Sequence, residues 1–317
     1  MKWPSYRDKA HQNMDTLRSK PALTVPEFGQ PVARNTSSPL TAKPRPRFQP
    51  KTLSSLKVIS IQSENADDTC RHMTQYLGEQ LGIETEFIDA IPWQEREHLL
   101  DTQQAHLGWI CGLPYIWKAD REHPHVELVA APVMQNFRYR QQPIYYSDVI
   151  VHKDSDYQSF EDLRGASWSY NEPHSQSGHN ITRYHLAKRG EYQGYFGRVI
   201  EAGSHLKSLE LLLENNIAAT AIDSTVLETE FAARPYLREQ IRVIETLRPS
   251  PMPPWVVTKN VPPPLREAIR QVFLSMHKTE EGRAILKQGQ IQKLARVDDH
   301  DYDSIRDMAQ LADQVKW

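Results

Sequence analysis

The sequence has little that would suit a membrane or a disulfide-bonded fold. None of its apolar runs reaches the roughly eighteen residues of a membrane-spanning helix, so we expect no membrane insertion. It contains only two cysteines, Cys70 and Cys111, and they show no CxxC spacing. A pair of this kind predicts buried thiols rather than a disulfide bridge.

The common motifs of catalysis are also missing. The chain has no G-x-S-x-G nucleophile elbow, no G-x-x-x-x-G-K-[ST] phosphate loop and no G-x-G-x-x-G dinucleotide motif. His174, His179 and His185 are close in the chain, but their separations do not put them on one helical face as in zinc pairs. We therefore predict no metal and no cofactor, and we expect no nucleic-acid partner.

Charge is distributed unevenly along the chain. Residues 1–53 hold ten Lys and Arg against three Asp and Glu, together with eight of the 22 prolines. Without apolar periodicity this composition predicts an extended or disordered tail, although a basic tail could also contact acidic partners. The start of the chain lacks the apolar core of a secretory signal. The sequence as written thus predicts a cytoplasmic location, or a periplasmic one if a signal was removed or export is non-standard.

Beyond the tail, strand and helix patterns alternate. Residues 56–61 alternate like a strand, residues 69–81 place apolar side chains on one helical face, and Gly82 fits the C-cap of that helix. Further strands are predicted over residues 84–88, 106–111, 126–132, 145–151, 166–170, 198–200, 218–222 and 242–246. Further helices are predicted over residues 177–189, 204–214, 225–233, 263–278, 280–289 and 303–315. This order predicts an α/β protein with mostly parallel strands.

The stretch Ser175-Gln176-Ser177-Gly178 comes directly before one of these helices. Hydroxyls, a side-chain amide and unpaired backbone N–H groups at a helix start favour a negative ligand, and glycine lets the backbone approach closely. These residues therefore predict an oxyanion cradle. The alternative is that Ser175 or Ser177 only caps the helix.

His205 and Asp223 stand at two other helix starts. His205 follows Ser204 and could point a donor into the same pocket, or it could be a surface residue of the capping loop. Asp223 ends a strand at a place where α/β sheets bind ligands, although a plain N-cap is the alternative. A carboxylate there could hold the histidine, accept a proton from a protonated oxyanion or meet a ligand amine.

Aromatic residues at strand ends are further candidates. Tyr145 and Tyr146 begin a long strand, and only one of them can readily face a cleft because side chains alternate. Trp109 and Tyr115 flank the loop after another strand, where they could contact a ligand or form buried scaffold. We include Tyr145 and Tyr115 among the predicted ligand-binding residues.

Several stretches in series carry a family likeness: HLGWICGLPY, YYSDVIVHKDSDYQSFEDLRGASWSYNEPHSQSGHNITRYHL, RVIEAGSHLKSLELLLENNIAATAIDS and EEGRAILKQGQIQKLARVDDHDYDSIR. From Ser55 to about Leu311 the chain resembles the PhnD-like family of phosphate, phosphite and phosphonate substrate-binding proteins of ABC transporters. The resemblance implies a two-lobed α/β fold of the type II periplasmic-binding-protein kind, with a central cleft and two crossover segments. It implies lobe I from residues 54–144 and 249–317, and lobe II from residues 145–248.

The resemblance also implies which residues hold the ligand, namely Tyr145, Ser175, Gln176, Ser177, His205 and Asp223. The family often has threonine where this chain has Gln176. It often has a further polar or aromatic contact where this chain has Ile110 and Cys111. Which anion is bound therefore stays open.

The function that the resemblance implies is non-catalytic binding of a small anion, either phosphate, phosphite or phosphonate. The protein would serve as a transport receptor with an ABC permease as partner, or as a sensor. One alternative is an enzyme similar to thiamine-pyrimidine synthase with His205 as the reacting residue, but the motif loops have no lysine to bind pyridoxal phosphate. Another is a scaffold or regulatory protein with a degenerate cleft, which the unusual tail and Cys111 would fit.

Overall fold

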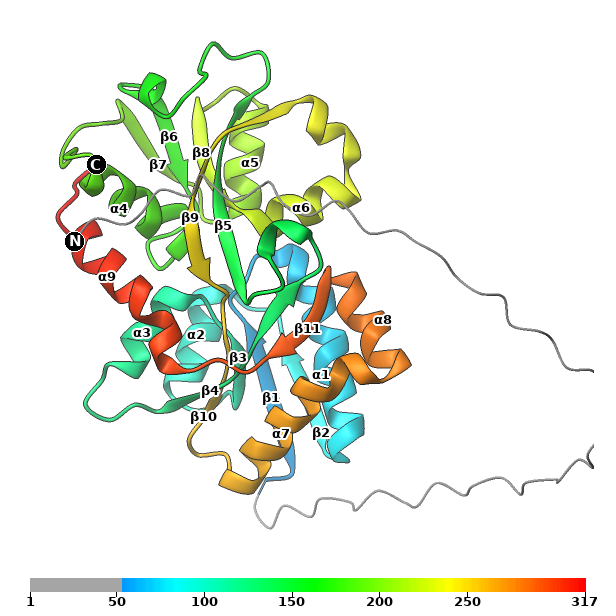
Figure 1. The fold of residues 1–317 in the computed structure, drawn as a ribbon. Helices are drawn as coiled ribbons and strands as arrows, with labels where there is room; N and C mark the ends of the chain where they lie inside the picture. The colour runs from blue at the N-terminus through cyan, green and yellow to red at the C-terminus, as the bar shows by residue number, and fades with distance from the viewer. Residues whose placement is uncertain (1–52) are drawn as a thin grey trace, which may run out of the picture. The chain divides into compact units, whose positions relative to one another are not determined.

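The computed structural model describes residues 53–317, which belong to one compact unit. Except for Leu53, the predicted basic tail lies outside these residues. The described chain builds two β-sheets with helices packed against them, which confirms the expected α/β class (Figure 1). We call them the β1 sheet and the β5 sheet after their first strands.

The β1 sheet contains six strands in the order β11-β4-β10-β3-β1-β2. Strand β1 pairs in parallel with β2 and β3, whereas β10 runs antiparallel to β3 and β4, and β11 antiparallel to β4. The strands are β1 (Ser55–Ser60), β2 (Glu84–Ile88), β3 (Leu107–Trp109), β4 (Val126–Met134), β10 (Trp255–Thr258) and β11 (Ile291–Ala295).

The β5 sheet contains five strands in the order β7-β6-β8-β5-β9. Strand β6 pairs in parallel with β7 and β8, and β5 runs antiparallel to β8 and β9. The strands are β5 (Ile144–His152), β6 (Ser167–Tyr170), β7 (Arg198–Glu201), β8 (Ala219–Asp223) and β9 (Ile241–Pro251).

The helices follow the apolar periodicity of the sequence. In α1 the buried Cys70, Met73 and Leu77 recur at spacings of three and four, and Gly82 ends the helix in the left-handed conformation with φ 67°. The helices are α1 (Asp67–Leu81), α2 (Trp93–Asp101), α3 (Gly112–Ala119), α4 (Ile181–Lys188), α5 (His205–Leu213), α6 (Ser224–Ala233), α7 (Pro263–Ser275), α8 (Glu280–Gln288) and α9 (Asp303–Ala312). Helices α4, α5 and α6 follow the parallel strands β6, β7 and β8, so they begin at one edge of the β5 sheet.

The prediction of mostly parallel strands is wrong, because both sheets are mixed. Strand β4 continues into β5, and β9 into β10, through short connections that lack the crossover helix of a parallel neighbour. The sequence patterns also missed α2, α3, β10 and β11. Helix α3 begins at Gly112-Leu113-Pro114, which looks like a turn, and β10 follows a proline-rich segment.

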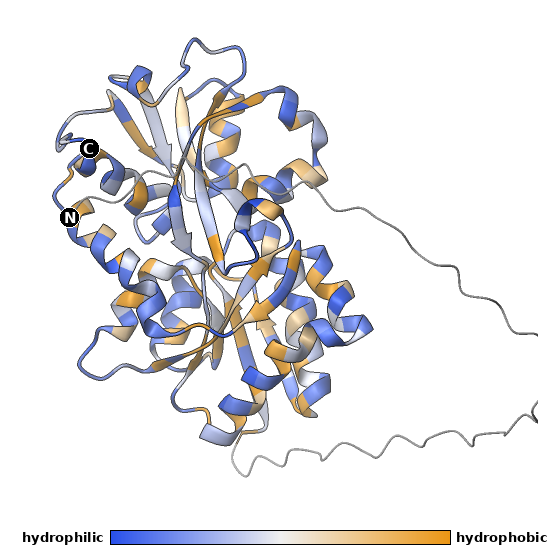
Figure 2. Ribbon diagram, in the orientation of Figure 1, coloured by the Kyte–Doolittle hydropathy of each residue, from blue (hydrophilic) through white to orange (hydrophobic). Residues whose placement is uncertain are grey.

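Apolar side chains gather on both sheets, as the orange strands in Figure 2 illustrate. In the cluster on the β1 sheet, the rings of Trp109 and Trp255 stack with centroids 5.6 Å apart. A cluster on the β5 sheet surrounds Trp168 and includes Met308 and Val315 from the end of the chain. Helix α9 therefore packs against the β5 sheet although it follows the last strand of the β1 sheet. The division into lobes at residues 144 and 249 stays a prediction.

Candidate functional site

The serine stretch forms the start of a helix, as predicted. Ser175 is the N-cap of a single π-helical turn, Gln176–Asn180, that runs directly into α4. Its Oγ accepts a hydrogen bond from the backbone N–H of Gly178 at 3.0 Å. The capping role that was the alternative interpretation is therefore present. Ser175 is the capping residue, and the hydroxyl of Ser177 makes a different contact.

Ser177 and His205 meet across two helix starts. Ser177 Oγ lies 2.9 Å from His205 Nε2 and 3.4 Å from Ser175 Oγ. His205 is the first residue of α5, behind the N-cap Ser204, whose Oγ accepts from the Lys207 N–H. The imidazole is only 6% exposed, which excludes a surface histidine. Burial lowers the pKa of His205 to about 3, so the ring is neutral near pH 7.

The side chain of Gln176 is used inside the protein. Its amide nitrogen donates to Ser250 Oγ at 3.1 Å, and its amide oxygen accepts from Asn180 at 2.7 Å. Its backbone N–H donates to Cys111 Sγ at 3.3 Å. Cys111, like Cys70, is a free thiol, as predicted. Gln176 thus braces the serine turn through its side chain.

Tyr145 and Asp223 complete this cluster. Tyr145 pairs in register with Ser250 on β9, and its hydroxyl lies beside those of Ser177 and Ser250 without a well-formed hydrogen bond to either.

Asp223 ends β8 and caps α6, where its Oδ1 accepts hydrogen bonds from the N–H and the hydroxyl of Thr225 at 2.8 and 2.7 Å. Burial raises the pKa of Asp223 to about 7. The hydroxyl of Tyr146 instead donates to the Arg138 carbonyl at 3.3 Å.

Gly178 allows the helix starts to approach each other. A Cβ added there would lie 2.1 Å from Asn171 Oδ1 and 3.2 Å from His205 Cε1. The first distance is far below van der Waals contact, so no other residue fits unless the Asn171 side chain or the loop after β6 shifts. Close approach, rather than an unusual φ, explains the glycine here.

A polar cavity of about 70 Å³ lies beside His205, between segments of the two sheets. The loop after β1 and helix α2 form one wall, and the loops after β6 and β7 form the other. Four of its side chains carry buried polar atoms without a hydrogen-bond partner among residues 53–317: Ser63 (Oγ), Arg96 (Nε and Nη1), Asn171 (Oδ1) and His205 (Nδ1). A wall with so many unsatisfied groups suits a polar ligand.

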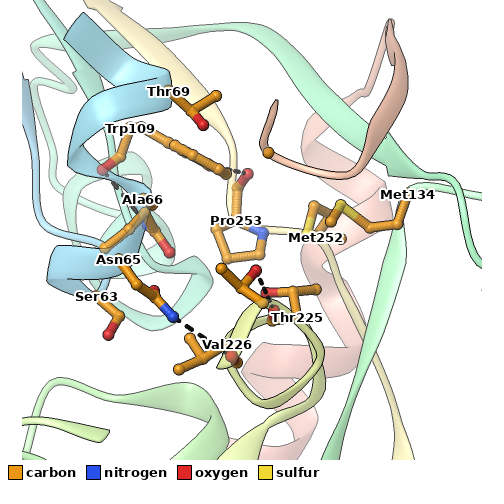
Figure 3. A pocket seen from close by; sticks show the side chains of 13 residues that line it. Ser63, Asn65, Ala66, Thr69, Trp109, Met134, Thr225, Val226, Met252 and Pro253 are labelled. Carbon is orange, nitrogen blue, oxygen red and sulfur yellow. Dashed lines mark hydrogen bonds between the residues drawn. The ribbon is translucent and has the colours of Figure 1, made fainter. Parts of the chain in front are cut away.

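An apolar cavity of about 40 Å³ adjoins the polar one, because Gln62 and Ser63 line both. Figure 3 shows Trp109, Met252 and Pro253 on one side of it and the start of α6 on the other. None of the side chains that line it is charged.

His174 joins the two walls at the rim. Its Nδ1 lies 3.0 Å from Glu97 Oε2, and the rings of Trp93 and Trp117 pack against it with centroids 5.3 and 5.1 Å away. The carboxylate of Glu97 raises the pKa of His174. His174 thus ties the loop after β6 to α2 and α3.

Tyr115 lies apart from the other predicted binding residues. Its hydroxyl donates to Asp299 Oδ1 at 2.6 Å, and its ring packs on Tyr302 with centroids 4.7 Å apart. The structure brings Tyr145, Ser175, Ser177, His205 and Asp223 together, with the Gln176 backbone, and does not bring Tyr115 to them.

Sequence reasoning missed Ser63, Asn171 and Arg96. Asn171 follows a predicted strand, a position that could have marked it. No local pattern marked Ser63 or Arg96 as a binding residue, since a serine after a strand is common and helix α2, which carries Arg96, was not predicted.

The described residues contain no group of three His, Cys, Asp or Glu side chains placed to hold a metal ion. Within residues 53–317, no helix combines the length and apolar character that crossing a membrane requires.

One protein-family model matches residues 58–302, more than half of the chain, and describes an ABC transporter, phosphonate, periplasmic substrate-binding protein. The chain belongs to this family. The predicted PhnD-like resemblance is thereby confirmed. The predicted function, substrate binding for an ABC transporter, is confirmed as well. The family consists of non-catalytic receptors, so the enzyme alternative is set aside.

Solved structures share the fold of this phosphonate-family protein. A binding protein component of an ABC phosphonate transporter from Pseudomonas aeruginosa is 20% identical, with a TM-score of 0.73 over 82% of this chain and 86% of that one. PhnD1 from Prochlorococcus marinus in complex with methylphosphonate is 18% identical, with a TM-score of 0.73 over 83% and 99%. A Xanthomonas citri protein bound to ATP is 14% identical, with a TM-score of 0.66 over 83% and 98%. These likenesses confirm the predicted two-lobed type II fold.

Proposed function

We propose that this protein binds the head group of a phosphonate between its two sheets, against Tyr145, Ser175, Ser177, His205 and Asp223. The convergence of Ser177, His205 and Tyr145 at the edge of the β5 sheet is the observation that carries the proposal. Each of these side chains is buried yet has hydrogen-bonding capacity left, since Tyr145 Oη and His205 Nδ1 have no partner within the described chain. A tetrahedral oxyanion would satisfy these groups together with the helix N-termini.

Protonation of Asp223 makes the cluster compatible with an anion. Because burial raises its pKa to about 7, the carboxyl is largely neutral below that pH and donates a hydrogen bond instead of repelling the ligand. Above that pH the carboxylate accepts a hydrogen bond from a singly protonated head group. The neutral His205 contributes a hydrogen bond without a full charge.

The apolar cavity is the place for the carbon substituent. It shares Gln62 and Ser63 with the polar cavity, is small, and has no carboxylate to pair with an ammonium group. We therefore propose a small alkylphosphonate, such as methylphosphonate, as a better ligand than 2-aminoethylphosphonate. The methylphosphonate complex of the Prochlorococcus relative is consistent with this ligand class.

Transport would follow from closure of two lobes around the ligand. The proposed lobes, residues 54–144 with 249–317 and residues 145–248, are joined by the connections from β4 to β5 and from β9 to β10. A hinge in these connections would close the cleft, and an ABC permease would recognise the closed form and receive the ligand at the periplasmic face.

Calorimetry and thermal unfolding test the proposal with methylphosphonate, phosphite, phosphate and 2-aminoethylphosphonate, with chloride at matched ionic strength as control. At a hundredfold excess over Kd, a true ligand raises the free energy of unfolding by roughly 2.7 kcal/mol. We expect the largest effect from methylphosphonate. If none of the four anions shifts the unfolding temperature more than chloride does, the proposal is wrong and the scaffold alternative gains support.

A further inference from the structure

Arg96 is a buried arginine whose guanidinium group is incompletely paired by the rest of the described chain. It lies on α2, is 6% exposed and lines the polar cavity. Its Nε and Nη1 have no hydrogen-bond partner among residues 53–317. The ion pair that it forms there is long, since Asp67 Oδ1 lies 3.6 Å from Nη1, beyond hydrogen-bond distance.

Among residues 53–317, Lys118, which is buried, and Arg138, which is partly buried, are well paired by contrast. Lys118 Nζ donates to Glu97 at 2.7 Å and to Asp101 at 2.8 Å. Arg138 donates to both carboxylate oxygens of Asp148, at 2.9 and 2.8 Å. Removing a cation from water without replacing its hydrogen bonds is costly, so Arg96 stands out among these groups.

Within residues 53–317, no acidic residue that lines the cavity forms an ion pair with Arg96, so its positive charge can act on a bound ligand. The acidic residues that line the cavity are Glu64, which is exposed to solvent, and Glu172, whose carboxylate accepts the His174 backbone N–H at 2.5 Å. No other Lys or Arg lines the cavity within the described residues. The cavity thus has a guanidinium on the α2 wall and the unpaired Nδ1 of His205 on the other.

We propose that Arg96 is a ligand-binding residue that contacts the oxyanion from the α2 side and supplies the positive charge of the cavity. The inference rests on the proposed function and adds a residue to it. The planar guanidinium fork suits two oxygens of one phosphonate or phosphate group, which is the geometry of a bidentate charge-assisted contact. Such a contact favours oxyanions in which two oxygens of one head group share the negative charge, as in phosphonate and phosphate.

Titration calorimetry with methylphosphonate and with phosphate tests this role in Arg96→Gln, Arg96→Lys and Asp67→Asn. Loss of a charge-assisted contact predicts roughly 10- to 100-fold weaker binding for Arg96→Gln. Arg96→Lys keeps the charge without the fork, so we expect an intermediate loss. Asp67→Asn removes the carboxylate that competes for the guanidinium, so we expect affinity at least equal to that of the wild type. Arg121→Gln, a half-exposed arginine outside the polar cavity, is the matched control.

The unfolding temperature of the ligand-free variants separates a binding role from a structural one. A binding residue predicts that Arg96→Gln leaves this temperature close to the wild-type value, because Nε and Nη1 have no hydrogen-bond partner among residues 53–317 and the ion pair to Asp67 is long. A lower unfolding temperature with unchanged affinity would overturn the inference and leave the proposed function standing. If the wild type binds neither anion, the proposed function and the inference both fail.

Nuclear magnetic resonance of the wild-type protein gives a second measurement that needs no folded variant. We expect methylphosphonate to shift the Arg96 Hε–Nε resonance downfield, as a new hydrogen bond to an anion does. Saturating ligand without a change in this resonance would overturn the inference even if Arg96→Gln failed to fold.

Discussion

The two walls of the polar cavity are built in different ways. On the β5-sheet wall, three parallel strands deliver the starts of α4, α5 and α6 to one edge, so backbone topology brings Ser177, His205 and Asp223 together. His205 lines the cavity, and Ser177 lies behind it at 2.9 Å from its Nε2. On the opposite wall, the contact is a long side chain, Arg96, that reaches the cavity from α2. The first wall offers neutral donors and the second offers charge.

This difference suggests a division of roles. The polar side chains of the β5-sheet wall are held in fixed positions. Ser177 contacts His205, Ser175 caps the turn before α4, and Asp223 caps α6. The α2 wall provides attraction, and it would meet the ligand as the lobes close. Substitutions in the β5-sheet wall and beside it test this division.

Gly178→Ala should disrupt the β5-sheet wall most. The new Cβ would lie 2.1 Å from Asn171 Oδ1 and 3.2 Å from His205 Cε1, so the Asn171 side chain must rotate or the loop after β6 must move, and the His205 ring must shift slightly. We expect a loss of about 1 to 3 kcal/mol in the free energy of unfolding, as for overpacking, together with loss of measurable ligand binding. Urea denaturation and calorimetry check both. Wild-type affinity in this variant would contradict the tight approach of the two helix starts.

Ser177→Ala should weaken binding without damaging the fold. It removes a hydroxyl that contacts His205 and would donate to the oxyanion, so we expect about 1.5 to 3 kcal/mol less binding free energy. Ser208→Ala is the matched control, because Ser208 is fully buried on α5 and its hydroxyl forms no hydrogen bond to Ser177 or His205. Equal affinities of the two variants by calorimetry would remove the serine turn from the site.

The pH dependence of binding should reflect Asp223. Its raised pKa of about 7 means that the folded protein keeps a proton that the unfolded chain loses near pH 4. Its contribution to stability is therefore full at low pH and is lost as pH rises from about 4 to 7. Binding that needs the protonated carboxyl should weaken about tenfold between pH 6.5 and 8.

Asp223→Asn separates this effect from titration of the ligand itself. Asparagine donates a hydrogen bond at every pH, so the ratio of wild-type to variant affinity should fall as pH rises. Calorimetry across that range measures the ratio. A ratio independent of pH would show that Asp223 does not exchange a proton with the bound anion.

Tyr145→Phe should have the smallest effect. The hydroxyl has no well-formed hydrogen bond among residues 53–317, so the free energy of unfolding should stay at the wild-type value. The binding free energy should fall by about 1 kcal/mol through loss of one neutral hydrogen bond. Tyr146→Phe is the control on the opposite face of the same strand. A larger loss of affinity in the Tyr146 variant would reverse the assignment of the two tyrosines.

The two walls also differ in how well the sequence predicts them. Small polar residues after strands and before helices are local signals, and they correctly predicted that Ser175, His205 and Asp223 stand at helix starts. Tyr115 looked equally well placed, but its hydroxyl is bound to Asp299, a partner 184 positions away that no local pattern reveals. Arg96 lies on a helix with weak apolar periodicity, and its place in the cavity depends on loops more than 70 residues further along the chain.

A crystal structure of the protein grown with methylphosphonate would show where the head group binds. We predict density for the head group in the polar cavity, within hydrogen-bond distance of Ser177, His205 and Tyr145 on one wall. Density elsewhere, or a cavity still empty at ligand concentrations that saturate binding in solution, would contradict the account.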